Sequence, residues 1–282
     1  MRLKTTVILL LILWVAGFPG GKTAADPGWK LVWSDEFDKP GQPDPSKWSY
    51  ESGFVRNGEL QYYTVNRRQN ARVENGHLVI EARKESWPNS GYQAGASDWG
   101  KSRKKADYTS ASLHTAGKAQ WTYARVEVRA KLPGGRGMWP AAWMLGSDIG
   151  KVGWPDCGEI DIMEFVGFAP DKVYTTVHTK AYNHVKGTQR GASLTLDAPD
   201  RGFHLYAVEW SPEAIEFFVD GKSTLRFPNE HKTTAEWPFD ASQYLILNSA
   251  VGGGWGGVKG VDDSIFPTRY EIDYVRVYQK GS

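Results

Sequence analysis

The sequence predicts an all-β fold, a sandwich or barrel built from many short strands. Short segments alternate apolar and polar residues with a period of two, and turns rich in glycine, asparagine and aspartate separate them. No segment carries a long apolar stripe at helical spacing. Regularly spaced short strands are typical of sandwiches and barrels. A sandwich of this length can form one unit, so we expect residues 26–282 to be a single domain.

Two hairpins and two further strands are the clearest elements. The hairpins turn at Asn75-Gly76 and Asp220-Gly221, dipeptides that favour tight two-residue connections. In chain order, the expected strands are residues 72–74, 77–83, 123–130, 215–219, 223–227 and 270–278. In the last strand, strict alternation places Ile272 with Tyr274 on one face and Asp273 with Val275 on the other.

The first 25 residues are typical of a secretory signal peptide. Arg2 and Lys4 form a basic start, an apolar run follows at 7–16, and Thr23-Ala24-Ala25 is a small-residue cleavage site. A membrane span needs roughly 20 apolar residues, so this run predicts export rather than an anchor. We therefore expect a secreted, extracellular monomer without a membrane partner.

Composition excludes several classes of function. Basic and acidic side chains nearly balance, at 34 against 32, and no basic run indicates a nucleic-acid surface. The single cysteine, Cys157, cannot form an internal disulfide, so a large core or a bound ion would have to stabilise an exported chain. No pair of histidines has zinc-ligand spacing, and no phosphate-binding glycine loop is complete. The 13 Trp and 13 Tyr residues either fill the core or line a groove.

The segment 159–164, of sequence EIDIME, carries three carboxylates. In a strand, Glu159 and Asp161 share one face and the isoleucines after them share the other. Strict alternation would turn Glu164 toward the apolar core, which is costly for a charged group. A β-bulge at Met163 would return Glu164 to the face of Asp161. We therefore expect a bulged strand with all three carboxylates on one face.

Three carboxylates on one face suit acid–base chemistry on a sugar. Like charges repel, so at least one pKa should be raised, as a general acid requires. Retaining glycosidases use a nucleophile and an acid/base about 5–5.5 Å apart. Glu159 and Glu164 could meet that distance, with Asp161 between them tuning the nucleophile. A solvent-facing acidic strand and a metal site are alternatives for the same pattern.

Aromatic residues accompany the carboxylates along the chain. Trp139 and Trp143 share a face of an expected strand, Trp154 precedes the carboxylates, and Trp255 stands in a glycine-rich loop. Each could line a groove for a sugar chain or pack in the core. His178, in the expected next strand, could donate a hydrogen bond to the acid/base carboxylate or be an ordinary structural residue.

These motifs together resemble glycoside hydrolase family 16. The E-x-D-x-x-E segment has the bulged form typical of the family's laminarinases. Further matching segments are residues 33–37, 57–63, 137–143, 154–155, 177–179, 248, 252–257 and 272–278. The resemblance implies a β-jelly-roll sandwich of two curved antiparallel sheets with a concave cleft. It also implies retaining endo-hydrolysis of β-1,3-glucans, and of mixed β-1,3/1,4-glucans as a further substrate, without a catalytic cofactor.

The resemblance also implies a role for each matching residue. Glu159 matches the nucleophile, Asp161 the assisting carboxylate, Glu164 the acid/base and His178 an orienting residue beside the acid/base. The implied substrate-binding residues are Asn57, Trp139, Trp143, Trp154 and Trp255. The implied ligands of a structural calcium ion are Glu36, Gly76 and Asp273, whose oxygens are of the kind that calcium prefers.

Three other functions remain open at this point. A glucan-recognition protein could use the same scaffold, although such proteins lose the carboxylates that this chain keeps. A hydrolase could instead act on a galactan or on a sulfated polymer. A sulfated substrate would favour a basic cleft, and the possible sources of that positive charge are Arg56, Arg67, Arg68 and residues 103–105. Transglycosylation would follow if a sugar, instead of water, captured the covalent glycosyl-enzyme intermediate. The segment 85–105 could be a loop that closes one end of the cleft.

Overall fold

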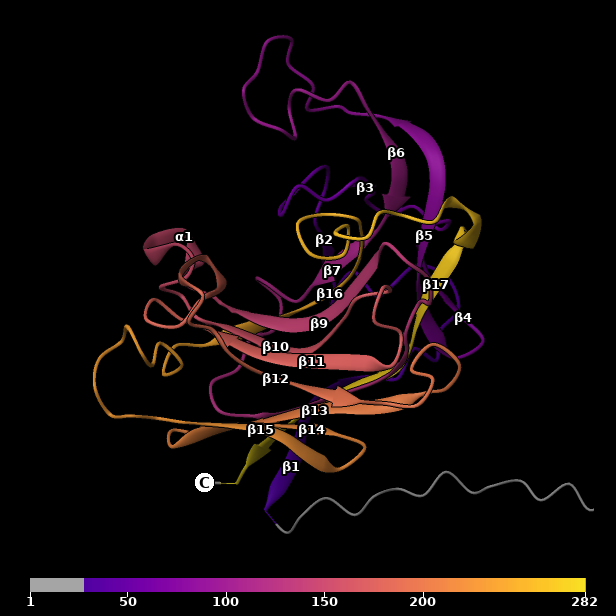
Figure 1. The fold of residues 1–282 in the computed structure, drawn as a ribbon. Helices are drawn as coiled ribbons and strands as arrows, with labels where there is room; N and C mark the ends of the chain where they lie inside the picture. Colours follow the sequence, from indigo (N-terminus) through magenta and orange to yellow (C-terminus); the bar gives the residue numbers. More distant parts are fainter. Residues whose placement is uncertain (1–27, 282) are drawn as a thin grey trace, which may run out of the picture.

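The computed structural model describes residues 28–281, and almost every element in them is a β-strand (Figure 1). Two sheets, of ten and seven strands, stack on one another, and all strand pairs but one are antiparallel. The predicted all-β jelly-roll sandwich is confirmed. The predicted signal peptide, residues 1–25, lies outside the described residues.

The larger sheet forms the convex side of the molecule. In spatial order it contains β15 (Lys222–Pro228), β14 (Ala214–Val219), β13 (His204–Trp210), β8 (Arg125–Lys131), β17 (Thr268–Lys280), β5 (His77–Pro88), β6 (Lys105–Ser110) and β3 (Gln61–Tyr63). Off this path, β1 (Trp29–Asp35) pairs with β17 and β4 (Ala71–Glu74) pairs with β5.

The smaller sheet supplies the concave side. Its order is β12 (Arg190–Thr195), β11 (Lys172–His178), β10 (Glu159–Phe165), β9 (Met138–Gly146), β16 (Gln243–Val251), β7 (Ser112–His114) and β2 (Ser49–Tyr50). The described helical turns are α1 (Ile149–Val152), η1 (His184–Lys186) and η2 (Asp263–Ile265). Within residues 28–281, none of these is long and apolar enough to cross a membrane.

Both predicted hairpins are confirmed. β4 and β5 meet at Asn75-Gly76, where φ is 54° and 77°, and β14 and β15 meet at Asp220-Gly221, where φ is 48° and 77°. Positive φ at both central residues matches the right-handed twist of the flanking strands. Asparagine, aspartate and glycine tolerate that conformation better than other residues.

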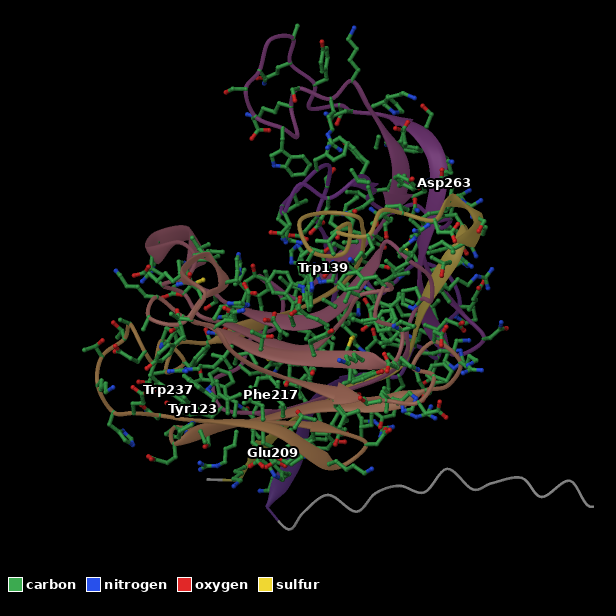
Figure 2. All side chains as sticks on the ribbon, in the orientation of Figure 1. Tyr123, Trp139, Glu209, Phe217, Trp237 and Asp263 are labelled. Atoms are coloured by element: carbon green, nitrogen blue, oxygen red, sulfur yellow. The ribbon has the colours of Figure 1, made fainter. Side chains whose placement is uncertain are left out.

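The main core lies between the two sheets. Alternate residues of each strand point inward and are buried there, as the two-residue period requires. Figure 2 shows Trp139 on the cleft side of the smaller sheet and Glu209 on the opposite side of the molecule. One face of the smaller sheet is thus committed to the core, and its other face is available for a site.

The strict alternation predicted for residues 270–278 is wrong. The pairing of β17 with β8 shifts between Ile272 and Tyr274, so Asp273 is an extra, bulged residue. As a result Ile272 and Val275 are both buried in the core, three positions apart. The bulge lets both apolar side chains face inward while Asp273 stays outside.

The segment 85–105 is more regular than the loop we expected. β5 continues to Pro88 and β6 begins at Lys105, so only the residues between them form the connection. Asn89 braces that connection, because its Nδ2 donates to the carbonyl oxygens of Gly100 (2.6 Å) and Arg103 (2.7 Å). The resulting arm rises above the concave side at one end (Figure 1).

Candidate active site

The carboxylate segment forms β10, in the middle of the smaller sheet. Asp161 pairs with Thr176 of β11, but Glu164 pairs with Tyr174, so β10 contains one extra residue between them. Ile162 and Met163 are both fully buried in the core. The predicted bulge is confirmed, and its cause is that two adjacent apolar side chains both face inward.

A cleft of about 1110 Å³ covers the concave side of this sheet. Its lining extends from β12 at one end to the segment 51–59 at the other, so the cleft crosses the strands. All predicted catalytic and substrate-binding residues line it: Asn57, Trp139, Trp143, Trp154, Glu159, Asp161, Glu164, His178 and Trp255. The structure brings these residues together, and their individual roles stay predictions.

Two tryptophans hold the outer carboxylates. Trp154 Nε1 donates to Glu159 Oε2 at 2.8 Å, and Trp139 Nε1 donates to Glu164 Oε1 at 3.0 Å. A charged acceptor makes such a hydrogen bond stronger than a neutral one. Each indole therefore fixes one carboxylate in place, a role that the sequence pattern did not indicate.

The remaining tryptophans differ in exposure. Trp143 is 8% exposed, and its Nε1 donates to Asn248 Oδ1 at 2.8 Å. Trp255 is partly exposed and meets Trp139 edge to face, with ring centroids 5.7 Å apart. A Cβ on Gly256 would lie 2.7 Å from Trp139, so glycine is required for this close approach. Trp139 and Trp255 thus form one wall of the cleft rather than a flat platform with Trp143.

Burial is the largest cause of the raised pKa of all three carboxylates. The charges of Glu159 and Glu164 add to the raised pKa of Asp161. Hydrogen bonds from Trp154 and Asp161 and the charge of Arg56 oppose the rise in the pKa of Glu159. Repulsion between the carboxylates, the cause that we expected from the sequence, is therefore secondary to burial. The raised pKa of Asp161 favours its protonated form, which can donate a hydrogen bond to an ionised Glu159.

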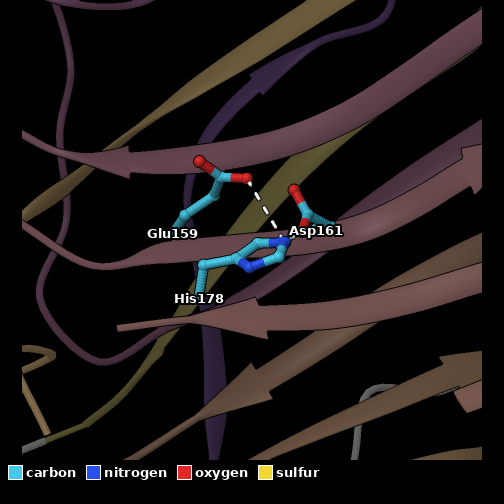
Figure 3. Close-up of side chains that lie close together, drawn as sticks. All are labelled: Glu159, Asp161 and His178. Carbon is cyan, nitrogen blue, oxygen red and sulfur yellow. Dashed lines mark ion pairs between the residues drawn. The ribbon is translucent and has the colours of Figure 1, made fainter. Parts of the chain in front are cut away.

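His178 lies beside Glu159 and Asp161 (Figure 3). It pairs with Glu159 across β10 and β11, and its Nε2 lies 3.8 Å from Glu159 Oε1 and 3.4 Å from Asp161 Oδ2. Tyr174, not His178, stands opposite Glu164, which corrects the expectation that His178 lies beside the acid/base. Burial lowers the pKa of His178 to about 4, so its imidazole is neutral at neutral pH.

Metal binding has to be weighed for the same cluster. Ligand atoms of Glu159, Asp161 and His178 all lie within 4.8 Å of one another. Two carboxylates and an imidazole could hold a divalent cation. One oxygen of Glu159, Oε2, however, accepts the Trp154 hydrogen bond, and the carboxylate lines the cleft together with Glu164. The donors and the second carboxyl group fit a glycosidase pair better.

Arg56 is the one basic residue, among those we considered for a basic cleft, that lines the cleft in the described structure. Arg67 instead pairs with Glu85, and Arg103 lines a separate hollow beside β5 and β6. The acidic residues in the cleft lining are Glu51, Glu59, Glu159, Asp161 and Glu164. The cleft is thus not basic, which disfavours a sulfated polymer.

Several lining residues escaped the sequence reasoning. His184 of η1 packs on Trp154, with ring centroids 5.0 Å apart, and Tyr174 meets Trp255 at 4.9 Å. Glu59 accepts a 2.6 Å hydrogen bond from Gln61 beneath the cleft. Of these, only Tyr174 carried a usable signal, since it lies at spacing four before His178 in one strand and so shares its face.

The three predicted calcium ligands lie near one another on the convex side. β1 ends one residue before Glu36, against the part of β17 that carries Asp273. His77, next to Gly76, has its Nε2 3.7 Å from the Asp273 carboxylate. Carbonyl and carboxylate oxygens of this kind fit calcium, although Arg129 also pairs with Asp273.

Comparison with known proteins places this geometry in a family. The model for "Glycosyl hydrolases family 16" matches residues 58–276. A "Beta-glucanase" of Rhodothermus marinus is 50% identical over 288 residues, which span 99% of this chain and 95% of that protein.

Solved structures agree with this result. The laminarinase of Rhodothermus marinus has a TM-score of 0.82 and 52% identity, covering 90% of this chain and 98% of that one. A variant of SCLam, a non-specific endo-β-1,3(4)-glucanase co-crystallised with 1,3-β-D-cellotriosyl-glucose, has a TM-score of 0.81 and 49% identity, covering 90% and 96%. The resemblance found in the sequence is confirmed: this chain belongs to glycoside hydrolase family 16.

Proposed function

We propose that this chain is a retaining endo-glucanase that hydrolyses β-1,3-glucans such as laminarin and also accepts mixed β-1,3/1,4-glucans. One observation carries the proposal: Glu159 and Glu164 lie on one bulged strand, face the same cleft, and each accepts a hydrogen bond from its own tryptophan. Relatives of this chain are a β-glucanase, a laminarinase and an endo-β-1,3(4)-glucanase. A neutral polymer also suits a cleft without excess basic residues.

In the first step, Glu159 attacks the anomeric carbon. The bond from that carbon to the bridging oxygen breaks, and Glu164 gives its proton to the departing oxygen. Asp161 donates a hydrogen bond to Glu159 and Trp154 donates another, so the carboxylate is held in position before it attacks. The raised pKa of Glu164 keeps its proton available at neutral pH.

In the second step, water replaces the leaving sugar. Glu164, now a carboxylate, takes a proton from the water, which attacks the anomeric carbon and releases Glu159. Two displacements restore the original configuration. The cleft crosses the sheet from β12 to the segment 51–59, so a chain can bind with sugars on both sides of the cleaved bond. This arrangement supports endo action.

The test is release of reducing ends from laminarin, barley β-glucan, lichenan, agarose and carrageenan, with wild type and Glu159→Ala. We expect release from laminarin and barley β-glucan by wild type, and a loss on the order of 10⁵-fold in the variant. Added azide should restore turnover to Glu159→Ala, because it can enter the space of the missing carboxylate. Wild-type activity on agarose or carrageenan alone would refute the proposed substrate.

We further propose that residues 1–25 direct secretion and are removed, leaving residues 26–282 as a single, monomeric catalytic domain. The amino-terminal pattern supports this. Sequencing of the amino terminus of protein recovered from the medium tests it: a chain that keeps Met1, or that stays inside the cell, would contradict it. Sedimentation at assay concentration tests the monomer.

We also propose a structural calcium ion held by oxygens of Glu36, Gly76 and Asp273. Because the ion would bind only the folded chain, calcium at 100 times its Kd should add about 2.7 kcal/mol to the free energy of unfolding. Thermal unfolding with excess EDTA or excess calcium measures this. Asp273→Asn should reduce the calcium-dependent increase in Tm. Equal Tm values in EDTA and calcium would end the proposal.

A further inference from the structure

One guanidinium in the cleft has an unsatisfied donor. Arg56 lines the cleft, and its Nη2 forms an ion pair with Glu51, whose other oxygen accepts a 2.6 Å hydrogen bond from Ser112 Oγ. Its Nη1 is buried from solvent and has no hydrogen-bond partner. A buried donor without a partner is costly, and most such groups in folded proteins find one. Because Arg56 lines the cleft, a ligand hydroxyl that enters beside the guanidinium would supply that partner.

The guanidinium is held rigidly. Its Cζ lies 5.0 Å from the ring centroid of Trp143, within the range of a cation–π contact. The following residue, Asn57, has a φ of 57°, and its carbonyl oxygen accepts a 2.8 Å hydrogen bond from Gly254. The Glu51 ion pair fixes the side chain, and the Gly254 bond fixes the backbone. The unpartnered donor is therefore preorganised before any ligand binds.

The position of Arg56 indicates where along the cleft its ligand would bind. It covers Trp143, which pairs with Asp161 across β9 and β10. It also reaches Glu51, which Ser112 of β7 holds. Arg56 therefore lies between the catalytic strand and the β2–β7 edge. A sugar there would be the neighbour of the reacting sugar.

The surrounding charge selects the chemistry of the ligand. Glu51 neutralises Arg56 directly, and Glu59 is close enough for its charge to stabilise the guanidinium as well. An anionic substituent would meet these carboxylates, whereas a neutral hydroxyl would meet only a hydrogen-bond donor. The ligand fits an uncharged sugar hydroxyl rather than a sulfate or a uronic acid.

We propose that Arg56 is a substrate-positioning residue, whose Nη1 donates a hydrogen bond to a hydroxyl of the glucose unit next to the reacting one, on the β2–β7 side of the cleft. This inference rests on the proposed function and names part of its substrate recognition. It assigns to Arg56 a binding role separate from the chemistry of Glu159 and Glu164.

Calorimetric binding of laminaritetraose tests the inference in a Glu159→Gln parent, which removes the nucleophile and keeps its shape. Adding Arg56→Met with Glu51→Gln removes both members of the ion pair, so no buried charge is left alone. We expect binding about 10- to 100-fold weaker than in the parent, the effect of a lost hydrogen bond to a charged group. Adding Arg56→Lys should give an intermediate affinity, because lysine keeps the charge but not the forked geometry.

Two controls isolate the effect. Arg103→Met removes another arginine that stacks on aromatic rings, 5.2 Å from Phe54 and 5.3 Å from Trp99, but that lies outside this cleft. It should change the affinity by less than about twofold. Glu51→Gln alone, with Arg56 present, should keep most of the affinity. Thermal unfolding checks each fold, and Arg56→Lys decides the matter if the double replacement does not fold.

The possible outcomes are distinct. Unchanged affinity in both Arg56 variants would overturn the inference, and so would an equal loss in the Arg103→Met control. A parent that binds no glucan, together with a wild type that cleaves none, would instead overturn the proposed function.

Discussion

The two faces of this molecule treat buried carboxylates in opposite ways. On the convex sheet, Glu81 is 2% exposed and pairs with three arginines, at positions 72, 83 and 269. In the cleft, Glu159 and Glu164 are held by tryptophan N–H groups and have no arginine or lysine within ion-pair distance among the described residues. Carboxylates paired with arginine hold the sheet together. Carboxylates buried without such a partner are typical of a reactive site.

The pKa values follow the same division. Arg72 lowers the pKa of Glu74, and Arg67 lowers that of Glu85, by hydrogen bonds to the ionised form. Burial raises the pKa of Glu159 and Glu164. Glu159 and Glu164 therefore hold their protons at a pH where Glu74 and Glu85 have lost theirs. A general acid needs that property, and a structural ion pair would be weakened by it.

The largest effect on this comparison should come from Glu164→Gln. The variant keeps the Trp139 hydrogen bond but has no proton to give, so kcat on laminarin should fall by about 10²- to 10⁴-fold. On an aryl glucoside whose leaving group needs no proton, the variant should regain most of the wild-type rate of the first step. Steady-state rates on both substrates measure the difference.

A matched control lies on the convex face. Glu209 pairs with Arg125 at 2.5 Å on the side of the molecule opposite the cleft (Figure 2). Glu209→Gln should leave kcat within about twofold of wild type. A similar loss in both variants, or no recovery with the activated leaving group, would contradict the assignment of Glu164.

The tryptophan donors allow a smaller, directional test. Trp154 stabilises the ionised form of Glu159, so Trp154→Phe should raise the pKa of Glu159. The acid limb of the pH profile of kcat/KM should then move to higher pH. Trp139→Phe should raise the pKa of Glu164 and move the alkaline limb of the same profile to higher pH. Each shift should be about one pH unit. Measured pH profiles in which the two variants move the same limb would show that the roles are not divided in this way.

The carboxylate strand was predictable because a charge marked its irregularity. In β10, strict alternation would bury Glu164 in the core, so the sequence itself required a bulge before that residue. In β17, strict alternation puts Asp273 on the face of Val275 and Arg276 on the face of Ile272, so each face carries a charge and the pattern does not identify the inward one. The bulge at Asp273 follows from packing, because Ile272 and Val275 both face the core.

Contacts between distant segments were less predictable. The sequence identified Trp139 and Trp154 as cleft residues, but not their hydrogen bonds to Glu164 and Glu159. Those bonds depend on side-chain direction across neighbouring strands and loops. The neighbours of His178 likewise follow from the register of β10 with β11, which a single sequence does not specify.

The smallest expected effect is on stability, and it separates the two faces again. Burial raises the pKa of Glu164 from 4.5 to about 7, so above pH 4.5 the unfolded chain loses this proton before the folded one does. Folding stability therefore falls as pH rises from 4.5 to about 7. Glu164→Gln removes this cost and should raise the free energy of unfolding at pH 7 by about 1–3 kcal/mol, with little change at pH 4.

Glu85→Gln should act in the opposite direction. Its folded-state pKa is lowered by Arg67, so its contribution to stability is present above the unfolded pKa and is lost as pH falls through the folded one. The loss at pH 7 should be no more than about 1 kcal/mol, because solvent screens this partly exposed pair. Urea unfolding of both variants at pH 4 and pH 7 measures the two signs. If Glu164→Gln proved as destabilising as Glu85→Gln at pH 7, Glu164 would have to form a stabilising ion pair in the folded protein. The cleft would then not lose folding stability in exchange for reactivity.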